Sequence, residues 1–278
     1  MKLKAASFNV DIKNPMDPGL YRDLMNREGV EVWGLQEVDQ CTRRYPENYE
    51  SDPLPLYCGD VYADAFFAKA VDFSRNGGYG NAVVCRYPLI EKEAFHLYSD
   101  DDEPSEMREA FRRLYREVDC RNPESVKGQI SVWGPGGLVS RGAVEPRGYG
   151  RVVFEKEGTR IAFYVSHLSF ENEALRKKQM EILKEAMLKD PVPYRILTAD
   201  FNADQGTYEF DVFKDDFNMA NGGKRIWYDT FREPSAPMRI ASIDNIITSK
   251  NIGILSVRVI PTGDLSDHDA LAAELELR

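Results

Sequence analysis

The 278-residue chain predicts an α+β fold in which many short strands are covered by a few helices. Three observations support this prediction. Short runs rich in β-branched and aromatic residues recur along the whole chain, and amphipathic helical segments are few. The two kinds of segment do not alternate strictly, which disfavours a doubly wound parallel sheet. No internal repeat or low-complexity linker divides the sequence, so we expect a single domain over residues 1–278.

The predicted strands are apolar runs bounded by turn residues. They cover residues 3–9, 30–36, 81–86, 150–156, 160–167, 194–199, 243–248, 254–260 and 270–277. The clearest helix is 172–189, because Leu175, Leu183 and Met187 fall on one face and charged residues fall on the other. This helix ends at Asp190, since the proline that follows pushes the preceding residue out of the α region.

The segment 91–145 stands apart from the strand-rich remainder and is expected to be an insertion of helix and loop. It contains a predicted helix, 105–118, with a stripe of arginines beside its apolar face. These arginines are Arg108, Arg112 and Arg116. In one interpretation the helix is solvated and its arginines pair weakly with neighbouring glutamates. In the other, the helix is a lid and an arginine faces the cleft to grip phosphate.

The acidic composition of the chain limits the kinds of partner that it can bind. The net charge is −10 and the pI is about 5.0, so most of the surface repels polyanions. Nucleic acid would need a locally basic cleft or bound cations. The N-terminal residues read as a strand rather than a secretory signal, and no run approaches the length of a membrane span. We therefore expect a cytoplasmic protein without stable membrane association, whose four cysteines are reduced.

Polar side chains occur where the first two predicted strands end. Asn9 closes the first strand, and Glu37 follows the apolar run of the second. A carboxylate in such a position is a reasonable ligand for Mg²⁺, which prefers oxygen donors. Taken alone, however, Glu37 is more often a solvated residue at a strand end.

Two further strands end in groups suited to catalysis. His167 stands at a junction between strand and helix, where a lone histidine is more often structural. Asp200 and Asn202 are alternate residues at the end of another strand, so their side chains can point in one direction. A carboxylate and an amide aimed at one point could bind a cation or orient a water molecule.

Asp244 lies within an apolar strand, where an unpaired charge is costly. His268, in the turn before the last strand, is its expected partner. A buried carboxylate bonded to an imidazole fixes the tautomer of the ring and favours its protonated form. The chain has three histidines, and two of them close strand-like runs, which makes a chance arrangement less plausible.

Taken together, these motifs appear in the order found in the endonuclease/exonuclease/phosphatase superfamily, and the chain resembles that family from residue 3 to residue 277. The motifs are Asn9, Leu35-Gln36-Glu37-Val38, Ser166-His167-Leu168, Asp200-Phe201-Asn202, Ile243-Asp244 and Ser266-Asp267-His268. Residues 80–89 and 145–148 resemble two further family signatures. The resemblance implies a deoxyribonuclease I-like, four-layer α/β/β/α sandwich with the site at one edge.

The resemblance also implies a hydrolase that uses Mg²⁺, or Mn²⁺, to cleave a phosphate ester by in-line attack of water. Glu37 would be the principal metal ligand, with Asn9 and Asp267 assisting. Asp11 sits where abasic-site endonucleases carry a metal-binding aspartate, but that position varies within the family. The departures are Ala199, in place of a common glycine, and Asn245, in place of a common tyrosine.

Roles for the remaining site residues follow from the same resemblance. Asp200 and Asn202 would position or deprotonate the water, and His268, oriented by Asp244, would hold the phosphate and take part in proton transfer. His167 would stabilise the phosphate or protonate the leaving group. Three residues would contact the substrate, with Arg147 neutralising charge on the phosphoryl oxygens. These are Asn9, Asn81 and Arg147.

The sequence leaves the substrate open. Phosphodiester cleavage is the first hypothesis. The alternatives are a phosphomonoesterase acting on a small phosphorylated metabolite or an inositol or sugar phosphate, and a nuclease acting on DNA or RNA, which the acidic composition disfavours. A catalytically inactive binding protein is the least favoured hypothesis, because every expected catalytic group is present. The oligomeric state is not predicted.

Overall fold

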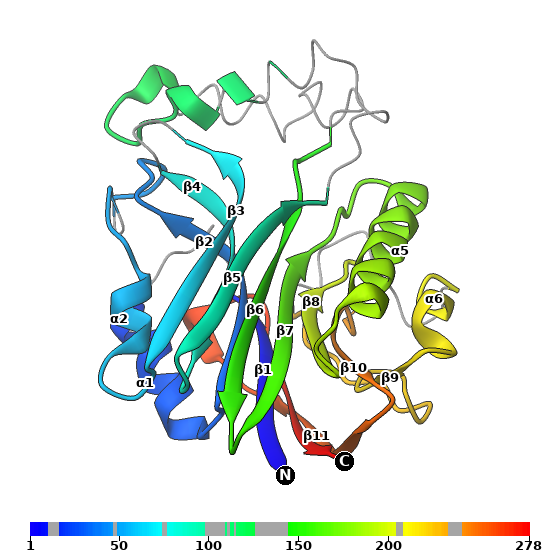
Figure 1. The fold of residues 1–278 in the computed structure, drawn as a ribbon. Helices are drawn as coiled ribbons and strands as arrows, with labels where there is room; N and C mark the ends of the chain where they lie inside the picture. Colours follow the sequence, from blue (N-terminus) through cyan, green and yellow to red (C-terminus); the bar gives the residue numbers. More distant parts are fainter. Residues whose placement is uncertain are drawn as a thin grey trace.

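The computed structural model describes residues 1–10, 17–46, 49–73, 77–97, 109, 112–113, 115–125, 144–203, 208–232 and 241–278. Two six-stranded sheets pack face to face in the centre of the molecule (Figure 1). Asp11 and Arg108, which the sequence analysis singled out, lie outside the described residues.

The first sheet has the strand order β11-β12-β1-β2-β4-β3. Its strands are β1 (Lys2–Asn9), β2 (Val32–Gln40), β3 (Asp64–Asp72), β4 (Gly78–Cys85), β11 (Ile252–Ile260) and β12 (Ala270–Leu277). β1 and β2 are parallel, and the other neighbours are antiparallel. Because β12 pairs with β1, the two ends of the chain lie close together (Figure 1).

The second sheet has the order β5-β6-β7-β8-β10-β9. Its strands are β5 (Leu89–His96), β6 (Gly148–Lys156), β7 (Thr159–His167), β8 (Tyr194–Asp200), β9 (Phe217–Met219) and β10 (Asp244–Ser249). β7 and β8 form the single parallel pair, joined by a helical crossover. The carboxyl ends of β7 and β8 therefore meet at one edge of the sheet.

Helices cover the outer face of each sheet and complete four layers. α1 (Pro18–Glu28) and α2 (Leu54–Cys58) pack on the first sheet, while α5 (Glu173–Lys189) and α6 (Asp211–Lys214) pack on the second (Figure 1). A short 3₁₀ helix, η4 (Gly263–Leu265), precedes β12. Side-chain caps start the two longest helices, because Asp17 accepts from Gly19 N and Asn172 accepts from Leu175 N. The predicted α+β sandwich is confirmed.

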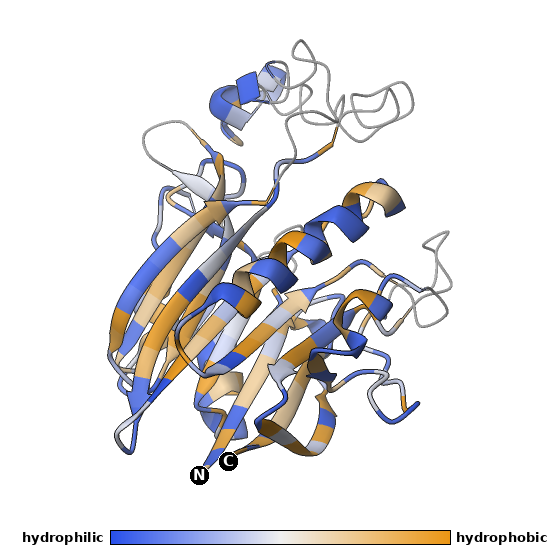
Figure 2. Ribbon diagram, turned by 45° about the vertical axis from the view of Figure 1, so that its right-hand side comes forward, coloured by the Kyte–Doolittle hydropathy of each residue, from blue (hydrophilic) through white to orange (hydrophobic). Residues whose placement is uncertain are grey.

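Three apolar cores hold the layers together, one between the sheets and one beneath each layer of helices. Alternate residues of β1 show the division: Leu3 and Ala5 enter the central core, whereas Ala6 and Phe8 enter the outer core. The inner strands therefore bury residues on both faces, and Figure 2 shows hydrophobic residues along the strands and a mixture of hydrophobic and hydrophilic residues along α5.

The two sheets lie in close contact at Gly34 of β2. A Cβ at this position would lie 1.9 Å from Thr198 Oγ1 and 3.1 Å from Val165 Cγ2, both in the second sheet. Only glycine fits there without displacing one sheet from the other. The close approach brings the ends of β1 and β2 next to the ends of β7 and β8.

All nine predicted strands and helix 172–189 are present, with ends shifted by a few residues. Strands β3, β5 and β9 and helices α1, α2 and α6 were not predicted. The segment 91–145 requires a correction, because residues up to His96 belong to β5 and pair with β6. β5 is an edge strand with mostly exposed, charged residues, so its sequence lacks the apolar pattern of the inner strands.

The structure also bears on the expectations about the cysteines and about membrane-spanning segments. Cys41, Cys58, Cys85 and Cys120 form no disulfide with one another. Within the described part of the chain, no helix is long and apolar enough to cross a membrane.

Candidate active site

The functional residues predicted from the sequence gather where strands of both sheets end. Because β7 and β8 run parallel, His167 and Asp200 occupy paired positions at their carboxyl ends. β10 runs antiparallel to β8, so its first residue, Asp244, pairs directly with Asp200. The parallel pair β1 and β2 brings Asn9 and Glu37 to the same edge from the other sheet. One edge of the sandwich thus collects groups from five strands.

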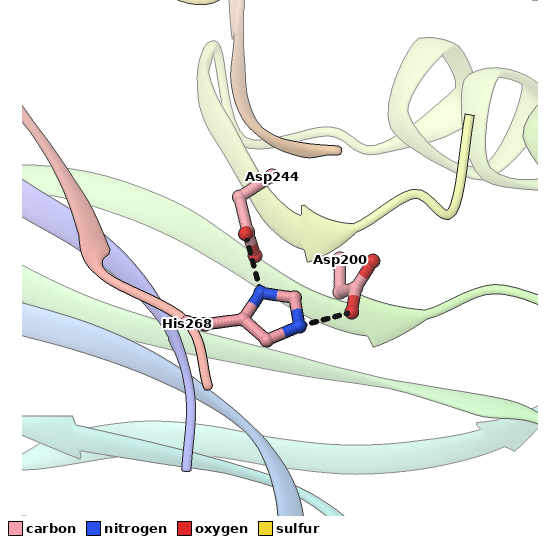
Figure 3. Close-up of side chains that lie close together, drawn as sticks. All are labelled: Asp200, Asp244 and His268. Carbon is pink, nitrogen blue, oxygen red and sulfur yellow. Dashed lines mark hydrogen bonds and ion pairs between the residues drawn. The ribbon is translucent and has the colours of Figure 1, made fainter. Parts of the chain in front are cut away.

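His268 lies between two buried carboxylates (Figure 3). Its Nδ1 is 2.8 Å from Asp244 Oδ2, and its Nε2 is 3.7 Å from Asp200 Oδ2. The hydroxyl of Thr230 also donates to Asp244 Oδ2, at 2.6 Å. Ser266 holds the turn in place, because its hydroxyl accepts from His268 N at 2.9 Å and donates to Asn9 O at 2.7 Å. Both ends of the imidazole are therefore fixed.

The electrostatics of this array favour a charged imidazole. Burial lowers the pKa of His268, but the neighbouring carboxylates, Asp244 foremost, raise that pKa by more, to about 10. Burial and the Asp244 charge raise the pKa of Asp200 above its ordinary value. Ligand atoms of Asp200, Asp244 and His268 lie within 4.8 Å of one another, close enough for a metal ion. In the structure these three groups form an ion-paired array.

Asn9 connects this array to Glu37. Its Nδ2 donates to Glu37 Oε1 at 3.2 Å and to Asp200 Oδ2 at 3.0 Å, so one amide holds carboxylates from both sheets. Pairing of β2 with β4 is irregular between Leu35 and Val38, and Glu37 has a positive φ of 60°. Such irregularities redirect a side chain at the end of a strand. The resulting donor set is rich in hard oxygen atoms and fits Mg²⁺ or Mn²⁺.

His167 is held by the opposite side of the site. Arg147 Nη1 lies 3.0 Å from His167 Nδ1, and because a guanidinium can only donate, Nδ1 is the acceptor nitrogen. Nε2 of His167 faces Asp200 Oδ2 at 3.4 Å. Asn202 Nδ2 lies 3.0 Å from the same Nε2 and donates to the carbonyl of Leu168 at 2.9 Å. His167 therefore directs Nε2 toward the centre of the site.

Arg147 belongs to a buried chain of contacts that starts in the segment before β6. Its Nη2 is 3.2 Å from Glu145 Oε2, and Glu145 Oε1 accepts from the hydroxyl of Tyr115 at 2.9 Å. The ring of Tyr115 packs edge-on against Phe73, with 4.9 Å between the centroids. Tyr115, Glu145 and Arg147 are each at least nine-tenths buried. The order Tyr115, Glu145, Arg147, His167 thus links this segment to the catalytic edge.

Among the described residues of the predicted helix 105–118, Tyr115 makes this contact. Arg112 and Arg116, two of the arginines considered for gripping phosphate, are exposed, and Arg116 lies 4.0 Å from Glu109. The sequence analysis singled out neither Tyr115 nor Thr230. Both act through partners distant in sequence, so no local pattern marks them.

The remaining predicted residues have these positions. Asp267 is partly exposed, with Oδ1 3.9 Å from His268 Nε2. Asn81 is buried and donates to the carbonyl of Gly148 at 3.0 Å, a contact that joins the two sheets beside Arg147.

Residues 6–268 match the family model described as the Endonuclease/Exonuclease/phosphatase family. The chain belongs to this family. The match includes every motif that carried the resemblance seen in the sequence. The name of the family describes hydrolases of phosphate esters, and the deoxyribonuclease I-like architecture predicted from the sequence agrees with the two packed sheets.

Solved structures of the family share the fold. A Bacteroides vulgatus endonuclease/exonuclease/phosphatase superimposes with a TM-score of 0.68 at 15% identity, over 100% of both chains. A mannosyl-6-phosphatase of Bacteroides thetaiotaomicron gives 0.67 at 18% identity, over 99% of this chain and 100% of that one. D. rerio TDP2, complexed with a single-strand DNA product, gives 0.64 at 13%, over 99% of both. None of the curated proteins compared with the chain matches it significantly.

One departure from the family pattern has a structural explanation. Asn245, which replaces the common tyrosine, exchanges two hydrogen bonds with the backbone of Asn221, at 2.8 and 2.9 Å. This amide fixes the loop after β9 against β10, next to Asp244. Asn245 therefore leaves Asp244 in its pairing with Asp200 and anchors a neighbouring loop.

Proposed function

We propose that the chain is a metal-dependent phosphoesterase in which an activated water attacks phosphorus in line. The observation that carries this proposal is the buried array of Asp244, His268 and Asp200, joined through Asn9 to Glu37. Buried charges are costly, and a fold retains them beside an open strand edge when they perform chemistry. Membership of a family of nucleases and phosphatases supports the same reaction class.

In this mechanism Asp200 accepts the proton of the attacking water. A carboxylate with a raised pKa is well suited to this role, since a base works best when its pKa is near the operating pH. Asn202 helps to place the water. Its backbone N donates to Asp200 Oδ1 at 3.0 Å, so it fixes the orientation of the carboxylate that receives the proton.

The cationic groups stabilise the phosphoryl oxygens. His268, kept protonated by Asp244, donates from Nε2 toward the substrate. On the other side, His167 presents its Nε2–H and Arg147 supplies a buried positive charge behind it. Preorganised donors of this kind supply the largest share of rate acceleration in many enzymes. The proton on His167 is also available to the leaving oxygen.

The donor set fits a divalent cation. Glu37, Asn9 and Asp267 would hold Mg²⁺ or Mn²⁺, with Asp11 as a further candidate, and the bound ion would act as a Lewis acid toward the phosphoryl group. We further propose that residues 1–278 form one domain. The family match over residues 6–268 and the full-length superpositions support this division.

Phosphodiesters are the substrate class that we propose first. A phosphomonoester of a small metabolite is the second candidate, favoured by the similarity to a mannosyl-6-phosphatase. The net charge of −10 disfavours a long nucleic acid, although TDP2, a structural neighbour, was solved with single-strand DNA product. We place the reaction in the cytoplasm.

The proposal is tested by measuring release of 4-nitrophenol from bis(4-nitrophenyl) phosphate and from 4-nitrophenyl phosphate with Mg²⁺ present. We expect turnover of the diester, complete inhibition by EDTA with recovery on excess Mg²⁺, and loss of turnover in His268→Ala. Faster turnover of the monoester would assign the second candidate. Turnover that survives both EDTA and His268→Ala would reject the proposed mechanism.

A further inference from the structure

A second concave site lies away from the catalytic edge. It is a groove of about 820 Å³ between the edge strand of each sheet, β9 and β11, and the loop of residues 220–228. Its apolar lining consists of Phe210, Phe217, Met219, Ala220, Ile226, Trp227, Tyr228, Ile254, Leu255 and Val257. A volume between about 300 and 1,000 Å³ is typical of sites for small molecules.

The groove is separate from the proposed active site. Asp244 opens β10 in the catalytic array, whereas Lys250 follows the end of the same strand and lines the groove. Six residues of extended chain span about 20 Å. In Figure 1 the strands that border the groove, β9 and β11, lie toward the end of the sandwich that carries the chain termini. The base of the loop of residues 220–228 lies beside the array, since Asn221 donates to Asp244 O at 2.9 Å, but none of Asp200, Asp244 and His268 lines the groove.

The charge of the groove is opposite to that of the protein. Five basic residues and one acidic residue line it, in a chain whose net charge is −10. The basic residues are Lys214, Lys224, Arg225, Lys250 and Arg278, and the acidic one is Asp211. Lys214 and Arg278 have carboxylate neighbours, at 3.7 and 2.9 Å, so the remaining three cations contribute most of the local field. Lys224 and Arg225 are exposed at the tip of the loop.

Apolar side chains are exposed beside these cations. Ile226 is 52% exposed on the loop, and Leu255 is 42% exposed on β11. Leu255 falls at a bulge in the pairing of β11 with β12. Both residues line the groove, so its walls offer apolar surface directly next to positive charge. This combination complements a ligand that has an apolar body and an anionic head.

The loop that forms one wall is held rigidly. Asn221 donates to Tyr228 O at 3.0 Å and accepts from Tyr228 N at 2.8 Å, which closes the base of the loop. Gly222 N bonds to Ile226 O, and the ring of Trp227 packs so close to Gly222 that a Cβ there would lie 2.6 Å from it. Trp227 in turn contacts Phe210, at 6.1 Å between ring centroids. The groove is thus formed before a ligand arrives, which lowers the entropic cost of binding.

We propose that this groove binds a small anionic amphiphile, such as a medium-chain carboxylate. The apolar chain lies against Ile226, Leu255 and Trp227, and the head group pairs with Lys224 and Arg225. The size of the groove favours a small molecule over a macromolecular partner. This site goes beyond phosphoester hydrolysis and does not depend on it.

The test is isothermal titration of the full chain with decanoate below its micelle concentration, with decanol as the uncharged probe. We expect saturable decanoate binding that weakens with salt, and weaker binding of decanol. The double variant Lys224→Glu with Arg225→Glu should weaken decanoate binding at least about tenfold, because it replaces two attractions by two repulsions. Its hydrolytic activity should remain unchanged, since neither residue touches the catalytic array.

The matched control is Lys177→Glu with Lys178→Glu, which makes the same change of charge on the exposed face of α5. Decanoate binding should be unaffected in this control. Equal weakening in both double variants would show that only the overall charge matters and would overturn the proposal. Absence of saturable binding to the unmodified chain, or unchanged binding in the groove variant, would also overturn it.

Discussion

Tyr115→Phe tests whether the segment before β6 positions the catalytic groups. The substitution removes the hydroxyl that donates to Glu145 Oε1 at 2.9 Å. It keeps the ring that packs on Phe73, so little apolar contact is lost. Glu145 remains buried beside Arg147 but loses one of the donors that fix its orientation. Any effect on chemistry then arises from the looser placement of Arg147 and, through it, His167.

The expected magnitude follows from the kind of bond removed. A hydrogen bond to a charged group contributes about 1.5–3 kcal/mol. If about 1.4 kcal/mol of this loss appears in the activation barrier, kcat falls about tenfold. The lost bond also lowers the free energy of unfolding, which corresponds to a decrease in Tm of a few degrees. KM should change little, because the substrate does not contact Tyr115.

A matched control is Tyr87→Phe at the opposite end of the sandwich. The hydroxyl of Tyr87 also donates to a partly buried glutamate, Glu31, which is also held by a cation, Lys156. Its ring likewise packs on a phenylalanine. Diester hydrolysis and thermal unfolding should be measured for both variants. We expect similar losses of Tm but a lower kcat in Tyr115→Phe alone. Equal kcat values in the two variants would refute the positioning role.

Three further predictions concern the array, the contact between sheets and the response to acid. Asp244→Asn should lower kcat by about 10²–10⁴, because His268 loses the charge that keeps it protonated; stopped assays from pH 5 to 9 should also show activity falling at high pH earlier than in the wild type. Gly34→Val should lower the free energy of unfolding in urea by about 3 kcal/mol or more, since its side chain would meet Thr198 within a packed interior. An unfolding midpoint close to that of the wild type would contradict the close approach. Burial raises the pKa of Asp190, but bonds from an arginine of β6 and a tyrosine of β7 lower it by more, so the net shift is downward. A lowered pKa stabilises the fold above the ordinary value of about 3.9 and loses this effect as pH falls through the folded-state value. Asp190→Asn should therefore be destabilised at pH 7 and approach the wild type at pH 3; a constant difference would contradict the assignment.

The sequence predicted those parts of the fold whose pattern is local. The inner strands are apolar on both faces, so they appear as continuous apolar runs, and α5 shows a clear amphipathic period. β3 was missed because its alanines and flanking aspartates resemble a helix as much as a strand. β9, with three residues, is too short to leave any period.

The sequence predicted which residues form the site but not which of them contact one another. The strand-end position of Asp200 and the need of Asp244 for a buried partner marked both residues as members of the site, and the structure brings them into register. The bonds from Asn9 to carboxylates of two different sheets depend on how closely the sheets approach, which no local pattern encodes. Tyr115 was not predicted, because its contact with Glu145 is made by a neutral hydroxyl, whereas the prediction for this helix rested on its charged arginines.

The most direct test of the account is the rate of diester hydrolysis by Asp200→Asn at saturating Mg²⁺. This carboxylate faces Asn9, His167 and His268, so every part of the proposed mechanism meets at it. The amide preserves its size but cannot accept the proton of the attacking water. We predict a kcat lower by about 10²–10⁴ in a protein that still folds. A kcat within a factor of about two of the wild type would contradict the central claim.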